Sequence, residues 1–449
     1  MALINSSRFG AIATLTRLTL PLLIGQLAIV GLGATDVLLS GRSGTEQLAG
    51  VTLGAALFDL PIMLLVGIFI ANGALVSRRH GAGDRRGLRR QLHASLGLAV
   101  PLGALGGLMV TALRWFILPG LDAPEDARAV ADAYLLPMTA SAVLLPFVLA
   151  FRTGLEGIGR PGVAMTFNLL AFALNIPLDY ALIYGHWGLP ALGGEGCAWS
   201  TLTILSVLVL GQLFYLRRAA HLRPLRLLRG ALGIQPKTVL ATARMGAPIG
   251  CAILAEAGFF HVVPLIIATL GATAVAAHGV AMTLDLMMFM VPLSLSQAIT
   301  LTLARSLGAG QADRARQVAF SGLTAGITLG LVQCGFFLIA GRTLPGLFST
   351  DGDVVALAGS LLQWAALIRI FDALHICGTG ILRGLGDTRS TLIISLAAFW
   401  GLGMPLCVWL AADSGAIGAW TAILAAVTAA SAMTLFQVAR KMSKLTAAT

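Results

Sequence analysis

Six carboxylates lie within long apolar stretches of this sequence, where a charged side chain has a high free-energy cost. A carboxylate at the centre of a bilayer costs a few kcal/mol or more, so a protein that retains one there usually needs it for transport. Because burial favours the neutral form, such an acid can take up a proton on one side of a membrane and release it on the other. The six are Asp36, Asp59, Asp179, Glu256, Asp285 and Asp372.

The clearest group of polar residues comes from three separate apolar stretches. Asn175 and Asp179 are four residues apart in the run LNIPLDY, so they share one face of a helix. Pro177 between them would loosen the backbone and free carbonyl oxygens for a ligand. Together with Asp36 and the hydroxyl of Thr201, they could form an oxygen-rich site for a proton or for a hard cation such as Na⁺.

The second half of the chain has its own buried acids. Glu256 and Asp372 lie within predicted spans, and Arg369 is one turn from Asp372 on the same helix face. Arg369 could therefore take part in transport or serve only as a permanent counter-ion for Asp372. For each acid the alternative is a structural group that is hydrogen-bonded to a neighbouring helix. For Asp59 and Asp285 a structural role is as good an interpretation as function. For His278 and His375 packing or hydrogen bonding is a better interpretation than binding a ligand.

Long apolar helices are needed to hold these residues. Of the 449 residues, 57% are hydrophobic and only 11% are charged, whereas soluble domains carry about 25% charged residues. A helix needs about 20 apolar residues to cross a bilayer. We therefore expect an all-α polytopic membrane protein with twelve transmembrane helices. The twelve stretches are 15–38, 49–76, 92–117, 130–151, 162–185, 196–215, 239–269, 275–303, 317–341, 355–381, 390–411 and 415–437.

The net charge of +11 is concentrated in alternate loops. The loop RRHGAGDRRGLRR (78–90) contains six Arg and the loop 217–237 is also basic, whereas 121–129 is acidic and 184–196 has no Lys or Arg. The positive-inside rule then predicts a bacterial inner-membrane protein with both termini in the cytoplasm. Basic residues placed in this way meet the lipid bilayer, and no nucleic-acid partner is expected.

The two halves of the chain repeat each other at one constant offset, which is the separation between Arg17 and Arg244. Six helices per half is an even number, so the halves share one orientation and should be related by a pseudo-twofold axis along the membrane normal. We expect an N-lobe at 1–220, a basic cytoplasmic linker at 221–236 and a C-lobe at 237–449. Halves of this kind can rock around a site, which gives alternating access. The repeated residues are Arg17 and Arg244, Pro21 and Pro248, Gly44 and Gly271, Arg78 and Arg305, and Gly157 and Gly384.

With these residues in place, the sequence resembles the multidrug and toxic compound extrusion (MATE) family, in its NorM-like bacterial branch. The resemblance covers nearly the whole chain. It implies two six-helix lobes and the export of cationic amphiphiles in exchange for H⁺ or Na⁺. The motifs that carry it are PLLIGQ (21–26), TDVLLSG (35–41), NIPLD (175–179), GGEGCA (193–198), AVAAH (274–278), RIFDA (369–373) and LRGLGDT (382–388).

The resemblance also assigns roles to the buried acids. It implies an N-lobe site formed by Asp36, Asn175, Asp179 and Thr201, and it makes Glu256 and Asp372 the C-lobe acids. The sequence departs from the NorM pattern one turn before the second C-lobe acid, where a tyrosine is replaced by Ile368 with Arg369 beside it. A fixed guanidinium would repel a bound Na⁺, so we expect the N-lobe to hold the ion. Proton and sodium coupling both remain open.

Other transporters fit the sequence less well. The run Asp84-Arg85-Arg86-Gly87 comes near the signature loop of major-facilitator transporters, but Leu88 breaks that pattern. A lipid-linked sugar flippase would need a cationic cavity, whereas acids predominate here. An exporter of one metabolite or siderophore stays an alternative.

No enzyme motif accompanies the acids. We find no H-E-x-x-H, no G-x-S-x-G and no phosphate-binding G-x-x-x-x-G-K, so neither an enzyme nor ATP-driven transport is expected. We also expect no cofactor other than the coupling ion and no bound metal beyond a possible Na⁺ at Asp36, Asn175 and Asp179. The expected protein is a monomer.

Overall fold

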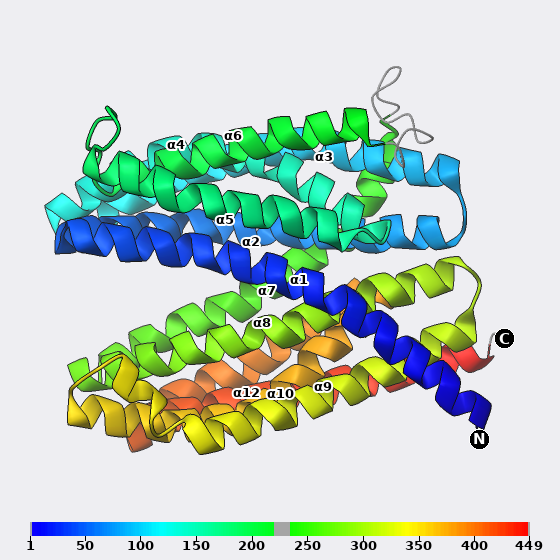
Figure 1. The fold of residues 1–449 in the computed structure, drawn as a ribbon. Coiled ribbons are helices and arrows are strands. Elements are labelled where there is room, and N and C mark those ends of the chain that lie inside the picture. The colour runs from blue at the N-terminus through cyan, green and yellow to red at the C-terminus, as the bar shows by residue number, and fades with distance from the viewer. Residues whose placement is uncertain (1, 220–233, 448–449) are drawn as a thin grey trace. The chain divides into compact units, whose positions relative to one another are not determined.

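The computed structural model describes residues 2–219 and 234–447, with side chains described from 10 to 219 and from 234 to 445. The predicted linker 221–236 lies almost entirely outside these residues. All the regular elements in the described residues are helical (Figure 1). The first six helices are α1 (Ala2–Ser43), α2 (Thr45–Gly81), α3 (Arg85–Ala112), α4 (Glu125–Gly157), α5 (Pro161–Tyr184) and α6 (Glu195–Arg218).

The second half follows the same order. Its helices are α7 (Pro236–Ala268), α8 (Ala272–Gly308), α9 (Ala312–Ala340), α10 (Gly352–Leu385), α11 (Thr388–Ser395) and α12 (Met404–Ala447). A π-helix, Leu396–Gly403, joins α11 to α12 without a break, and a shorter one, Leu113–Ile117, extends α3. Short 3₁₀ turns lie at Leu118–Gly120 and Leu344–Leu347.

Within the described residues, eleven helices are long and apolar enough to cross a membrane, and the last of them contains two predicted segments. It covers residues 388–445, but at Gly415 the backbone leaves the helical conformation, with φ 62° and ψ −145°. The chain then folds back on itself: Gln437 Nε2 donates to Ser390 Oγ at 2.8 Å. The stretches 390–411 and 415–437 are therefore separate antiparallel segments, in agreement with the twelve predicted from the sequence.

The duplication inferred from the sequence is visible in the backbone. α2 and α8 begin and end at positions related by the offset that separates Arg17 from Arg244. Positive-φ glycine conformations, which other residues adopt only with strain, recur at this same offset. The pairs are Gly44 and Gly271, Gly83 and Gly310, Gly159 and Gly386, and Gly188 and Gly415.

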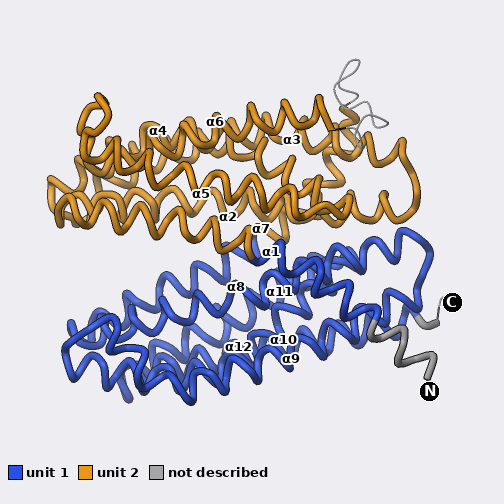
Figure 2. The backbone as a smooth tube through the Cα atoms, viewed as in Figure 1, with its two compact units in different colours: residues 1–23, 251–449 blue, residues 24–250 orange. Residues whose placement is uncertain are grey.

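The described chain forms two compact units, and these differ from the predicted lobes at two segments. Unit 1 comprises residues 1–23 and 251–449, and unit 2 comprises residues 24–250 (Figure 2). The first part of α1 thus belongs to unit 1, although the sequence placed it in the N-lobe at 1–220. The first part of α7 belongs to unit 2, although the sequence placed it in the C-lobe at 237–449. Leu15 and Leu22 of α1 pack in the core of unit 1, whereas Thr242 of α7 hydrogen-bonds to Gln91 in unit 2. The two unit boundaries occupy equivalent positions of the internal repeat.

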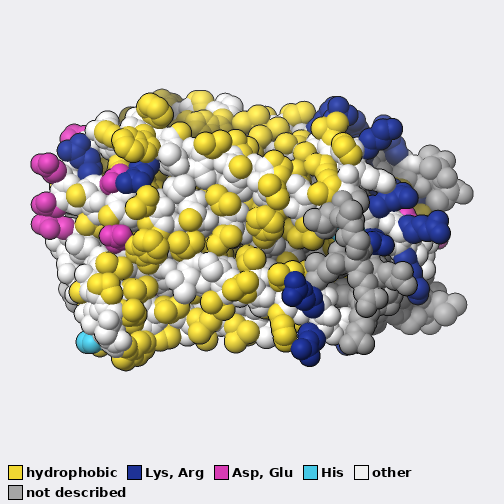
Figure 3. All heavy atoms as spheres, turned by 90° about the horizontal axis from the view of Figure 1, so that it is seen from above, with side chains coloured by type: hydrophobic (Ala, Val, Ile, Leu, Met, Phe, Trp, Pro, Cys, Tyr) yellow, Lys and Arg dark blue, Asp and Glu magenta, His cyan; other side chains and the backbone are white. Residues whose placement is uncertain are grey.

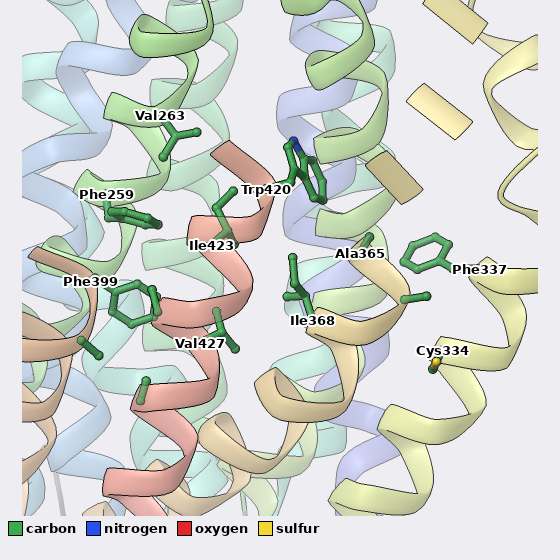
Figure 4. Close-up of a cluster of buried hydrophobic side chains, with 14 of the residues drawn as sticks. Phe259, Val263, Cys334, Phe337, Ala365, Ile368, Phe399, Trp420, Ile423 and Val427 are labelled. Carbon is green, nitrogen blue, oxygen red and sulfur yellow. The ribbon is translucent and has the colours of Figure 1, made fainter. Parts of the chain in front are cut away.

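Apolar side chains build the interior of each unit and much of its surface. In unit 1, Phe259, Phe399 and Trp420 belong to one large buried cluster (Figure 4). One face of the molecule carries hydrophobic side chains across its middle (Figure 3). Lys and Arg gather at one end, and Asp and Glu lie at the other end together with further basic side chains. This distribution suits a chain whose middle contacts lipid tails and whose ends contact water and headgroups.

Asp387, just before α11, links the start of the α11–α12 hairpin to its end. This carboxylate accepts hydrogen bonds from Gln437 Nε2 at 2.8 Å and from the Ser390 amide at 3.4 Å, and it lies 2.9 Å from Lys441 Nζ. Burial acts to raise the pKa of Asp387, but the hydrogen bonds from Lys441, Gln437 and Ser390 outweigh it and hold the pKa below its ordinary value. The ionised form therefore stabilises the folded protein.

We expect Asp387→Asn to lower the stability of the purified protein by about 1 kcal/mol at pH 7, because the charge-assisted bonds are lost. The pKa of this carboxyl is lower in the folded protein than in the unfolded chain, where it is about 4. Its contribution to stability is therefore fully present above the unfolded pKa and is lost as the pH falls through the folded pKa. Melting temperatures measured between pH 7 and pH 3 should therefore converge for the wild type and the variant at acid pH. The exposed Asp413→Asn is the control, and a constant difference at every pH would contradict this role.

Candidate functional site

The predicted helix face of α5 is turned into the protein. α5 begins with Pro161 at its first position and ends at Gly185 in the left-handed conformation, and it continues through Pro177. Asn175 and Asp179 are almost completely buried, with relative exposures of 1% and 0%, whereas the intervening Ile176 is 47% exposed. The spacing of four residues therefore places both polar groups on the inner face.

Asp36 of α1 meets this face within unit 2. Asn175 Nδ2 donates a hydrogen bond to Asp36 Oδ1 at 3.3 Å. Asp179 lies beside the same carboxylate and beside the Ser200 hydroxyl of α6, close enough to interact electrostatically with both. The structure thus brings together the three residues Asp36, Asn175 and Asp179, which come from two helices that are far apart in the chain.

Four buried oxygen atoms at this place have no hydrogen-bond partner within the described protein. They are both carboxylate oxygens of Asp179, Oδ1 of Asn175 and Oγ of Ser200. Buried polar atoms are normally satisfied, so a group of four that are not satisfied makes this place a candidate binding site. Oxygen donors of this kind suit a proton or a hard monovalent cation.

No basic side chain in the described part of the chain neutralises these acids. Among the described residues, neither Asp36 nor Asp179 forms an ion pair with Lys, Arg or His. Two carboxylates this close repel each other when both are charged, so a shared proton or a cation would relieve the repulsion. The buried phenol of Tyr134 and the thiol of Cys197 complete the surroundings, and Cys197 Sγ lies 3.8 Å from the Asp36 carbonyl oxygen.

The candidate acids of unit 1 differ from Asp36 and Asp179, because each of the three has a basic neighbour. Arg369 of α10 donates from Nη2 to Asp285 Oδ2 of α8 at 3.0 Å, and its Nε lies 3.0 Å from Asp285 Oδ1. Its Nη1 is 3.4 Å from Asp372 Oδ2. All three side chains are at least nine-tenths buried. This is a buried triad in which one guanidinium serves two carboxylates.

Glu256 of α7 has a second set of partners. It accepts a hydrogen bond from Ser395 Oγ at 2.6 Å and lies 3.4 Å from His375 Nε2. The other ring nitrogen of His375 is 2.9 Å from Thr434 Oγ1. The buried Arg383 also acts electrostatically on Glu256. Glu256 is therefore held by neighbours from other helices of its own unit.

The comparison with known proteins agrees with this architecture. The MatE family model matches residues 21–181 and 248–409, which is most of both halves. The chain belongs to the MatE family. This assignment excludes the major-facilitator alternative.

Relatives and solved structures cover nearly the whole length of this MatE protein. Multidrug resistance protein PmpM of Pseudomonas aeruginosa is 33% identical over 95% of this chain and 91% of its own. Probable multidrug resistance protein NorM of Chromobacterium violaceum is 32% identical, with coverages of 95% and 93%. A solved variant of the Vibrio cholerae MATE transporter VcmN is 19% identical with a TM-score of 0.89 over 98% of each chain, which shows a shared fold.

Some of the candidate residues lie elsewhere than the sequence suggested. On α6 of this MatE protein, Ser200 rather than Thr201 is the hydroxyl beside Asp179. Asp59 has an exposed side chain on α2. His278 accepts a hydrogen bond from Trp420 Nε1 at 3.1 Å, which fits a structural role.

Arg369 lies nearer to Asp285 than to Asp372, its predicted counter-ion. No local pattern in the chain indicates this pair, because the two residues are 84 positions apart on different helices. Ser200 could have been found from helical phase, since adjacent residues of a helix point about 100° apart.

The buried triad makes a prediction about stability. Arg369→Met should destabilise the purified protein by about 3 kcal/mol or more, because it leaves two buried carboxylates without a cation. Adding Asp285→Asn to Arg369→Met should restore part of the loss. Unfolding in detergent micelles would measure both effects, with the exposed Arg342→Met as the control. If Arg369→Met were no more harmful than the control, the triad would not contribute to stability.

Proposed function

We propose that this MatE protein is a secondary active exporter that moves cationic amphiphilic compounds out of the cell in exchange for H⁺ or Na⁺. The observation that carries the proposal is the acid pair of unit 2, buried Asp179 and half-buried Asp36, which has no basic partner among the described residues. The names of PmpM and NorM, both multidrug resistance proteins, support efflux of several compounds rather than one. Alternating access supplies the mechanism.

In this mechanism the coupling ion binds at Asp36, Asn175 and Asp179, with Ser200 as a further oxygen donor. Binding of a proton or Na⁺ removes negative charge from the buried site, so the free energies of the inward-open and outward-open states change by different amounts. A ligand can shift the equilibrium between two states only through such differential affinity. A cationic substrate favours the charged form of the acids, and competition with the ion then couples the two movements.

The acids of unit 1 are less suited to a mobile cation. Arg369 already supplies positive charge to Asp285 and Asp372, and a second cation beside it would be repelled. We therefore assign the coupling ion to unit 2. The charge distribution of the loops supports a bacterial inner-membrane location with both termini in the cytoplasm. Because one chain carries both halves, a monomer suffices for this mechanism.

Asp36→Asn should abolish the drug resistance that the wild-type protein confers on an efflux-deficient host. The amide keeps the shape of the side chain but can neither bind a proton nor attract a cation. Resistance should be measured alongside the amount of protein in the membrane, with the exposed loop variant Asp122→Asn as a matched control. Unchanged resistance in Asp36→Asn at equal expression would remove Asp36 from the mechanism.

Ion coupling should be visible in vesicles that contain the purified protein. Movement of a cationic dye should accelerate when either a proton gradient or a sodium gradient is imposed, and the effective gradient identifies the ion. The acceleration should be absent in Asp36→Asn. Dye movement that responds to neither gradient would disprove coupled exchange, and the same assay would still detect uncoupled transport.

A further inference from the structure

Four buried polar side chains connect the first part of α7 to the helices of unit 2. Gln91 of α3 donates from Nε2 to Thr242 Oγ1 of α7 at 2.9 Å and to Asn72 Oδ1 of α2 at 3.1 Å. Asn72 Nδ2 in turn donates to Thr153 Oγ1 of α4 at 3.0 Å. The relative exposures of the four residues lie between 0% and 5%. The result is a continuous hydrogen-bonded network across four helices.

Glycines bring α7 unusually close to α2 beside this network. Gly246 and Gly250 are four residues apart, so they form one small-residue face on α7. A Cβ on Gly246 would collide with the backbone of Ile68, and one on Gly250 would collide with the Leu64 carbonyl. On α2, a Cβ on Gly67 would collide with Gly250 itself. A face of this kind lets two helix backbones pack in direct contact inside a membrane.

The internal repeat shows that this arrangement is not a general feature of the fold. The residues at the equivalent positions of unit 1 all lack a polar side chain: Leu15 for Thr242, Ile299 for Asn72, Val318 for Gln91 and Gly380 for Thr153. Leu15, Ile299 and Val318 belong to the buried hydrophobic cluster of unit 1. Gly246 and Gly250 correspond to Thr19 and Leu23, so the glycine face is missing from α1 as well.

The two arrangements differ in how they respond to movement. Hydrogen bonds between buried groups depend strongly on distance and angle, and a donor or acceptor that loses its partner cannot turn to water. Apolar contacts are non-directional, so one helix can shift along another with a smaller change in free energy. α1 and α7 both have residues in the two compact units, so relative motion of the units must deform these helices.

We propose that Asn72, Gln91, Thr153 and Thr242 are positioning residues that fix the first part of α7 to unit 2 throughout the transport cycle. Deformation of α7 then occurs beyond Gly250, at the boundary between the units, and not in residues 236–250. The apolar counterpart at the start of α1 gives that helix no comparable restraint. The inference about the cycle rests on the proposed function, whereas the attachment of α7 to unit 2 does not.

Hydrogen–deuterium exchange on the full chain in lipid nanodiscs tests the attachment. Thr242→Val keeps the shape of the side chain but removes the acceptor for Gln91, so amide exchange in residues 236–250 should rise roughly fivefold, the factor expected for one buried hydrogen bond. Gln91→Leu should act in the same way, and Thr242→Ser should behave like the wild type. Thr238→Val is the matched control, because it makes the same chemical change one turn away outside the network. If Thr242→Val exchanged like Thr238→Val, the proposal would be overturned.

Dye transport in vesicles tests the role in the cycle. Per folded molecule, Thr242→Val should lower the maximal rate roughly fivefold and leave the KM for the dye unchanged, and Thr242→Ser should restore the rate. A purely structural role would lower the amount of folded protein without changing the rate per molecule, and that result would overturn the positioning role. If the wild type moved no dye while the exchange pattern held, the proposed function would fail and the attachment of α7 would stand.

Discussion

The interior of a bilayer contains no water, so every polar group placed there must find its partner within the protein or bind one from solution. This constraint explains how the charged residues of the chain are distributed. In unit 1, Asp285, Asp372 and Glu256 each lie beside a basic side chain. In unit 2, Asp36 and Asp179 have no such neighbour among the described residues. The candidate acids of unit 1 thus have basic partners within the protein, and those of unit 2 are the ones that our proposal assigns to the coupling ion.

The internal repeat makes this difference easier to interpret. The backbone is shared between the halves, down to the positive-φ glycines that recur at equivalent positions. The candidate acids are not shared: Asp36 corresponds to Val263 and Asp179 to Leu406, while Glu256 corresponds to Ile29. Backbone geometry is thus common to both halves, whereas each half carries its own buried chemistry. The hydrogen-bonded network around Thr242 and its apolar counterpart around Leu15 follow the same rule.

Several features of the site depend on contacts between distant helices. The spacing of Asn175 and Asp179 was enough to predict a shared helix face, because neighbours four residues apart lie one above the other. The partner of Arg369 could not be predicted in this way. The sequence offers Asp372 one turn away, but the guanidinium reaches across to Asp285 on another helix, with a closest distance of 3.0 Å against 3.4 Å. Helical phase alone could not decide between these two acids.

Residue matches at one constant offset revealed the duplication. Composition and periodicity determined the class of protein and the twelve apolar segments, because a bilayer imposes a length and a polarity on every segment that crosses it. They also identified the buried acids as the residues of interest. Only the tertiary structure decided which of those acids share a site, that Ser200 faces Asp179, and that the first parts of α1 and α7 pack in exchanged units. The physical reason is that packing between helices depends on side-chain fit across distances of many residues, and no local pattern in the chain records that fit.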